Sequence, residues 1–221
     1  MGQVCNLQAG LQPAFRLRAE SFSTLQYGYN GPCHSHGMER RSCRRLPHLY
    51  IQDQPTFITW RLFGSLPPSR VFPAKTSSGR TFVAMDSILD RGRTGPLYLR
   101  RPELARLTVN AIQYAQDHLQ LYRLHAYAVM PNHVHLLLTP LADIARITQS
   151  VKRFTAREAN RLLGLTGQPF WQDESFDHVV RNTGEFGRIA AYVENNPVRA
   201  GLAAEPADFE WSSAKSRLQT G

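Results

Sequence analysis

The chain has 221 residues and a formal net charge of +9, with a sequence pI near 9.9. This length is enough for one medium-sized domain with a hydrophobic core. A basic excess of this size favours a polyanionic partner, most commonly a nucleic acid. The sequence contains no run of about 18 apolar residues, so it predicts no membrane-spanning helix.

The first 45 residues differ from the rest of the chain. They are rich in Gly, Ser, Gln and Arg and have no sustained apolar period, which predicts a disordered N-terminal extension over residues 1–45 and a folded domain over 46–221. The extension holds all the cysteines, Cys5, Cys33 and Cys43. An odd number outside the folded part argues against a disulfide framework and is typical of a reducing cytoplasm.

The next elements alternate between strand and helix patterns. Residues 56–67, TFITWRLFGSLP, are β-branched and aromatic before Gly-Ser and Pro-Pro, which predicts a strand followed by a loop. Residues 68–100 are broken by Pro, Gly and Ser and predict a long irregular connection. Apolar residues at helical spacing then predict a helix over residues 101–120, with Pro102 in its first turn.

A hairpin follows this helix. Residues 122–130, YRLHAYAVM, are a strand candidate, and residues 133–140, HVHLLLTP, return as its partner after a Pro-Asn turn. The spacing then predicts a helix over residues 143–163 with two distinct sides. Its apolar side is formed by Ile144, Ile147, Val151 and Phe154, and its basic side by Arg146, Arg153, Arg157 and Arg161.

The remaining pattern completes the expected fold. Residues 170–181, FWQDESFDHVVR, read as part turn and part strand, and residues 183–196 as a final helix that Pro197 stops. The order strand–helix–strand–strand–helix–strand–helix predicts an α+β, ferredoxin-like (split β-α-β) domain. Its helices are expected on one face of an antiparallel sheet.

The motif MPNHVHLLL contains the strongest candidate site. Side chains alternate along a strand, so His133 and His135 point to the same face, about 7 Å apart or less. That is near enough for both imidazoles to bind one metal ion. A later histidine, His178, could complete the ligand set and leave positions open for a substrate phosphate. Three acidic residues close to it could take its place: Asp173, Glu174 and Asp177.

Several separated motifs together resemble a known family. HVH between apolar residues matches the HUH motif, in which U is apolar, and it is accompanied by RRLPHLYIQDQPTFITWRLFGSLP, FWQDESFDHVVR, AYVENNPVRAGL and FEWSSA. In the order in which they occur along the chain, they resemble the REP-associated tyrosine transposases, relatives of the single-tyrosine transposases of small bacterial insertion sequences. The resemblance covers about residues 44–214.

The resemblance implies an HUH domain, often dimeric, that binds single-stranded DNA folded into imperfect hairpins. It implies Mg²⁺ or Mn²⁺ held by His133, His135 and a third polar ligand. A tyrosine would attack the scissile phosphate and form a 5′-phosphotyrosine link with release of a 3′-OH. A transposase that nicks and rejoins DNA is therefore expected.

The nucleophile departs from the pattern. Many relatives carry a tyrosine at or next to the positions of Ser175 and Phe176, where this chain has none. Tyr192, in AYVENNP, is the sole tyrosine after the histidine pair. It is either the nucleophile or a residue whose ring packs on the inner face of its helix. The alternative function is a non-catalytic DNA-binding descendant that has lost its nucleophile.

Basic residues supply the expected DNA contacts. The stripe of Arg146, Arg153, Arg157 and Arg161, with Lys152 beside it, could bind phosphates or could be a solvated helix face. Arg199, which follows Pro197, could also reach the DNA backbone.

Overall fold

The computed structural model describes residues 54–67, 78–92 and 94–217. The predicted N-terminal extension and its cysteines lie outside the described residues. Within them, no helix has the length and apolar content needed to cross a membrane.

The described core is a four-stranded sheet with strand order β2-β3-β1-β4 and antiparallel pairing throughout. Its strands are β1 (Thr56–Leu62), β2 (Tyr122–Val129), β3 (His133–Pro140) and β4 (Trp171–Val179). Strands β1 and β2 flank β3 and therefore run parallel to each other, joined by a crossover that contains α2 (Pro102–Asp117). In the same way α3 (Ile144–Leu163) joins β3 to β4. Two interleaved split β-α-β units confirm the predicted α+β, ferredoxin-like fold.

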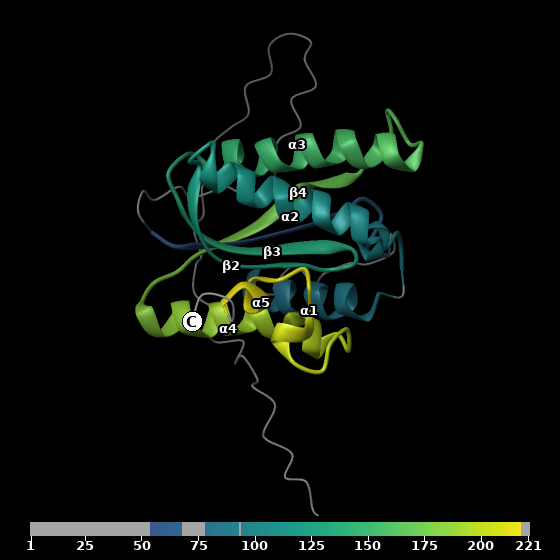
Figure 1. The fold of residues 1–221 in the computed structure, drawn as a ribbon. Helices are drawn as coiled ribbons and strands as arrows, with labels where there is room; N and C mark the ends of the chain where they lie inside the picture. The colour runs from purple at the N-terminus through teal and green to yellow at the C-terminus, as the bar shows by residue number, and fades with distance from the viewer. Residues whose placement is uncertain (1–53, 68–77, 93, 218–221) are drawn as a thin grey trace, which may run out of the picture.

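The helices cover both faces of this sheet, so the prediction of a single covered face is wrong. Figure 1 shows α2 and α3 on one side, and α1 (Ser78–Arg91) and α4 (Thr183–Arg199) on the other. Trp60 of β1 packs in the cluster with α2 and α3, whereas Phe57 packs in the cluster with α1 and α4. All residues of β1 except Arg61 are buried. Such a strand, apolar on both faces, requires a layer on each side.

Helix α1 lies where the sequence predicted an irregular connection. Its buried residues Phe82, Asp86 and Leu89 are spaced by four and three positions and therefore share one helical face. Pro, Gly and Ser on either side of this short pattern obscured it. The shorter elements are η2 (Tyr98–Arg100), η3 (Pro206–Asp208) and α5 (Ser213–Arg217).

Helix α4 continues through Pro197 to Arg199 rather than stopping at Asn196. A proline in the last turn removes one backbone hydrogen bond of the helix. The end is held by other bonds, from Ala200 N to Asn196 O (3.0 Å) and from Leu202 N to Pro197 O (2.8 Å). As a consequence, Arg199 keeps a helical position relative to Tyr192.

The C-terminal segment pairs with the outer edge of β2. Val129 N donates to Trp211 O at 2.9 Å, and Ala128 forms an isolated antiparallel bridge with Ser212. Tyr127 N donates to the hydroxyl of Ser213 at 3.1 Å. Residues after α4 therefore pair with the last residues of β2, along its outer edge.

Candidate metal and tyrosine site

The two histidines of HVH meet on the side of the sheet that α1 and α4 cover. Both are fully buried, and their Nε2 atoms lie 2.9 Å apart. Their neighbour Leu137, two residues on, packs in the cluster with α1 and α4. The expectation that strand alternation brings His133 and His135 together is confirmed.

The orientation of each ring is fixed by its other nitrogen. Asn132 Nδ2 donates to Leu89 O at 3.0 Å, so its Oδ1 faces His133 Nδ1 at 2.6 Å and accepts from it. His133 Nε2 therefore presents a lone pair. His135 Nδ1 lies 2.7 Å from Thr59 Oγ1, on the neighbouring strand β1. Such contacts set the tautomer of a metal-binding imidazole.

Helix α1 brings a carboxylate to the pair. Asp86 Oδ1 lies 3.2 Å from His135 Nε2 and 3.7 Å from His133 Nε2. The ligand atoms of these three buried side chains all lie within 4.8 Å of one another. Asp86 Oδ1 has no hydrogen-bond partner among the described residues. Two imidazole nitrogens and one carboxylate oxygen at this spacing could hold a divalent ion.

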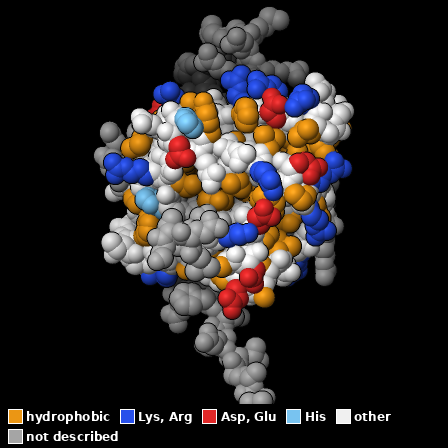
Figure 2. Space-filling model, in the orientation of Figure 1, with side chains coloured by type: hydrophobic (Ala, Val, Ile, Leu, Met, Phe, Trp, Pro, Cys, Tyr) orange, Lys and Arg blue, Asp and Glu red, His pale blue; other side chains and the backbone are white. Residues whose placement is uncertain are grey.

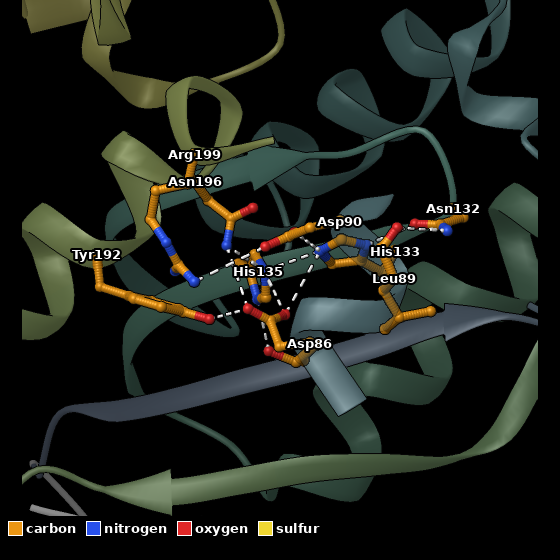
Figure 3. Close-up of polar contacts among 10 residues, drawn as sticks. Asp86, Leu89, Asp90, Asn132, His133, His135, Tyr192, Asn196 and Arg199 are labelled. Carbon is orange, nitrogen blue, oxygen red and sulfur yellow. Dashed lines mark hydrogen bonds and ion pairs between the residues drawn. The ribbon is translucent and has the colours of Figure 1, made fainter. Parts of the chain in front are cut away.

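Helix α4 adds a phenol and an amide to the same cluster. Tyr192 and Asn196 are four residues apart and so share a helical face. The Tyr192 hydroxyl donates to Asp86 Oδ2, and Asn196 Nδ2 lies 3.2 Å from His135 Nε2 (Figure 3). Asp86 Oδ1 lies at the same distance from this nitrogen, so His135 Nε2 faces both a donor and an acceptor. Asn196 Oδ1 is buried without a hydrogen-bond partner in the described part of the chain.

Burial and the neighbouring charges set the protonation of the cluster. Burial, with His135 nearby, lowers the pKa of His133 to about 3, against the attraction of Asp86. Burial would raise the pKa of Asp86, but the interactions with His135, His133 and Tyr192 hold it well below its usual value. Burial and the Asp86 carboxylate raise the pKa of Tyr192. The site thus combines a neutral His133 imidazole, an ionised carboxylate and a neutral phenol.

A second carboxylate and a cation border this cluster. Asp90 lies one turn after Asp86 on α1, with its Oδ1 3.8 Å from His133 Nε2. Arg199 Nη2 lies 3.8 Å from Asp90 Oδ2, and the Arg199 guanidinium stands 4.9 Å from the centre of the Tyr192 ring. Burial and the charge of Asp86 raise the pKa of Asp90 to about 8, against the effect of Arg199.

The structure does not bring His178 to the histidine pair. Its Nε2 lies 3.0 Å from Glu185 Oε1, and Glu185 Oε2 accepts from Arg181 N at 2.7 Å. Glu185 N in turn donates to the side chain of Asn182, the N-cap of α4. His178 therefore contacts the start of α4. The other candidates for a third ligand also lie outside the group of possible metal ligands found in the described residues: Asp173, Glu174 and Asp177.

The basic stripe lies on the opposite side of the sheet from the histidines. Its arginines are exposed on α3, and Figure 2 shows Lys and Arg side chains at the upper rim of the view, over this helix. Lys152 Nζ donates to the backbone oxygens of Gln172 (2.6 Å) and Asp173 (3.0 Å). Phe154, predicted on the apolar face, is 44% exposed, and Arg157 stands over its ring.

Part of the chain is similar in sequence to known transposases. Residues 104–196 match the family model of IS200-like transposases. The chain is 28% identical over 96 residues to a REP-associated tyrosine transposase from Escherichia coli (strain K12). That match covers 42% of the chain and 54% of the relative, so the chain spans about half the length of that relative.

A solved structure shares the fold. It is a REP-associated tyrosine transposase bound to a REP hairpin, and it matches with a TM-score of 0.53 and 17% identity. The match covers 80% of this chain and 86% of that one. Residues 104–196 are therefore similar in sequence to IS200-like transposases, and the chain shares its fold with the hairpin-bound relative.

Proposed function

We propose that the chain is a metal-dependent transposase that cuts and rejoins single-stranded, hairpin-forming DNA through a covalent link to Tyr192. The observation that carries this proposal is the position of Asp86. One of its oxygens accepts from the Tyr192 hydroxyl, while the other lies beside both histidine Nε2 atoms. A nucleophile and two metal-ligating nitrogens thus share one buried carboxylate.

The chemistry of the donor atoms fits a divalent cation such as Mg²⁺ or Mn²⁺. His133 Nε2 and His135 Nε2 lie 2.9 Å apart and within 3.7 Å of Asp86 Oδ1, so two neutral imidazoles and this carboxylate could direct three donor atoms at one cation. Asp86 Oδ1 is an anionic oxygen without a hydrogen-bond partner among the described residues. Asn196 could supply a further oxygen if its amide turned over. A bound ion would polarise the scissile phosphate and neutralise part of its charge.

Apart from metal binding, the reaction requires that the reacting groups are aligned and that one proton is transferred. The Tyr192 oxygen attacks phosphorus while the bond from phosphorus to the 3′-oxygen breaks. The phenolic proton passes to Asp86 Oδ2, to which it is already hydrogen-bonded, and the leaving 3′-oxygen takes up a proton from solvent. The products are a 5′-phosphotyrosine and a free 3′-OH, and the reverse reaction with another 3′-OH rejoins the strand.

The DNA partner is supported by charge and by the relative of known structure. The net charge of +9 favours a polyanion, and that relative is bound to a REP hairpin. We further propose that the chain acts as a homodimer, as the family resemblance implies. Light scattering coupled to size-exclusion chromatography measures this directly.

Cleavage with end-labelled hairpin oligonucleotides in Mn²⁺ tests the proposal. DNA labelled at its 3′ end should form a protein adduct on a denaturing gel, and 5′-labelled DNA should give a shorter strand that a polymerase can extend. Tyr192→Phe should abolish both products, whereas Tyr114→Phe, which changes an exposed ring on α2, should form both normally. His133→Ala with His135→Ala should also abolish cleavage.

Two results would contradict the proposal in different ways. An adduct that persists in Tyr192→Phe would exclude Tyr192 as the nucleophile. Hairpin binding by the wild type without any adduct or shortened strand would exclude strand cleavage, and would leave the DNA-binding descendant as the function.

A further inference from the structure

Arg199 places a cation beside the tyrosine of the site. It lies seven residues after Tyr192 on α4, which is two helical turns and the same face. Its guanidinium stands 4.9 Å from the centre of the tyrosine ring. This arrangement depends on the continuation of α4 through Pro197.

Arg199 also lies at the border between the cluster and solvent. Its side chain is 43% exposed, whereas that of Asp90 is 10% exposed and that of His133 is fully buried. Figure 3 shows the Arg199 side chain extending from α4 toward Asp90, beside the Tyr192 ring. Among the charged residues of the cluster, Asp86, Asp90 and Arg199, the guanidinium is therefore the group most open to solvent.

The contact of Arg199 with Asp90 is too long for a hydrogen bond, so the guanidinium could bind another anion more closely. Its closest nitrogen–oxygen distance is 3.8 Å, longer than a charge-assisted hydrogen bond of about 2.7–2.9 Å. Asp90 Oδ1 has no hydrogen-bond partner within the described ranges. A phosphodiester presents two non-bridging oxygens that match the paired N–H groups of a guanidinium. Such a group would bind Arg199 more closely than Asp90 does.

We propose that Arg199 binds the non-bridging oxygens of the scissile phosphodiester, and that this phosphate replaces the long contact of Arg199 with Asp90. The inference rests on the proposed function and specifies how that site holds its substrate. The phosphate then lies against the face of the tyrosine that attacks it. Its negative charge, spread over the equatorial oxygens during the transfer, is stabilised by a fixed cation.

Single-turnover adduct formation, measured against DNA concentration, tests the role of Arg199. Arg199→Ala should lower the rate at saturating DNA about a hundredfold, as loss of a transition-state donor does. Arg199→Lys should recover part of this loss. Arg188→Ala is the matched control, because it removes the same charge from an exposed position three turns earlier on α4.

A modified substrate separates phosphate binding from a structural effect. Once the cleavage position is mapped, a neutral methylphosphonate at that linkage removes the charge that Arg199 binds. The wild type and Arg188→Ala should both bind this DNA more weakly than the unmodified strand, whereas Arg199→Ala should bind the two equally. An equal preference in Arg199→Ala and Arg188→Ala would overturn the inference.

If the wild type forms adducts while Arg199→Ala behaves as Arg188→Ala does, the inference fails and the proposed function stands. Absence of any wild-type adduct removes both.

Discussion

At the scale of single residues, the chemistry of the site centres on Asp86. This carboxylate connects the tyrosine to the histidine pair, yet its sequence context marks no motif. HVH could be recognised because strand alternation constrains two close residues. Asp86 is 47 residues before His133, and no local rule relates two positions so far apart. Asn196 could have been predicted as a neighbour of Tyr192, since it lies four residues later on a predicted helix.

Replacing Asp86 should weaken metal binding. Asp86→Asn removes the anionic ligand beside both Nε2 atoms, so Mn²⁺ affinity should fall about tenfold or more. Isothermal titration calorimetry with Mn²⁺ measures this change. Asp173→Asn, at an exposed position of β4, is the control and should bind as the wild type does. Equal affinity in both variants would contradict the assignment of Asp86 as a ligand.

Replacing Asp90 should change how stability depends on pH. The native carboxyl keeps its proton up to about pH 8, whereas an unperturbed one ionises near pH 3.8. The native state therefore binds more protons in this window, and the Asp90 contribution to the free energy of unfolding decreases as pH rises through it. Asp90→Asn removes that dependence.

The stability of Asp90→Asn relative to the wild type should thus increase between about pH 5 and pH 8 and level off above it. Thermal unfolding of both proteins in EDTA, followed by circular dichroism, gives this difference. Curves that run parallel across the window would show that Asp90 is not protonated in the native protein.

At the scale of elements, the sequence predicted three strands and three of the four covering helices from their apolar patterns, and it read β4, whose residues are mostly polar, as part turn and part strand. Helix α1 was missed because its buried positions are few and its flanks are rich in Pro, Gly and Ser. That omission also hid the carboxylates, since both lie on this helix. The length of α4 was underestimated because a proline was taken as a stop, although a helix tolerates it in its last turn at the cost of one hydrogen bond.

The start of α4 should be sensitive to loss of its cap. Asn182 accepts a hydrogen bond from Glu185 N, so Asn182→Ala should lower the free energy of unfolding by about 1 kcal/mol. Urea unfolding measures this loss. Asn195→Ala, at an exposed position of the same helix, is the comparison and should cost less. A smaller loss for Asn182→Ala than for Asn195→Ala would contradict the capping role.

At the scale of the whole molecule, the sheet separates two groups of candidate residues. The metal and tyrosine cluster lies under α1 and α4, and the arginine stripe lies on the outer side of α3. The sequence could propose both groups but not their relation, because it did not predict that both faces of the sheet are covered. DNA that contacted both would have to pass around an edge of the sheet.

The arginine stripe should contribute to DNA affinity but not to metal binding. If Arg153 and Arg157 each neutralise one phosphate, the double Ala variant should weaken hairpin binding and reduce the slope of log affinity against log salt by about 2. Fluorescence anisotropy over a range of salt concentrations measures the slope, and calorimetry with Mn²⁺ should show no change. An unaltered slope would identify the stripe as a solvated surface.

The pairing of the C-terminal segment with β2 has a consequence for self-association. An unpaired edge strand is a template for a strand from another molecule. At residues 127–129, β2 already forms hydrogen bonds with Trp211 and Ser213. Its backbone there is therefore not open to pairing with a strand from another molecule. Two copies joined by a continuous sheet would therefore not meet along this part of β2, and the rest of β2 and the opposite edge strand, β4, are the edges left to test.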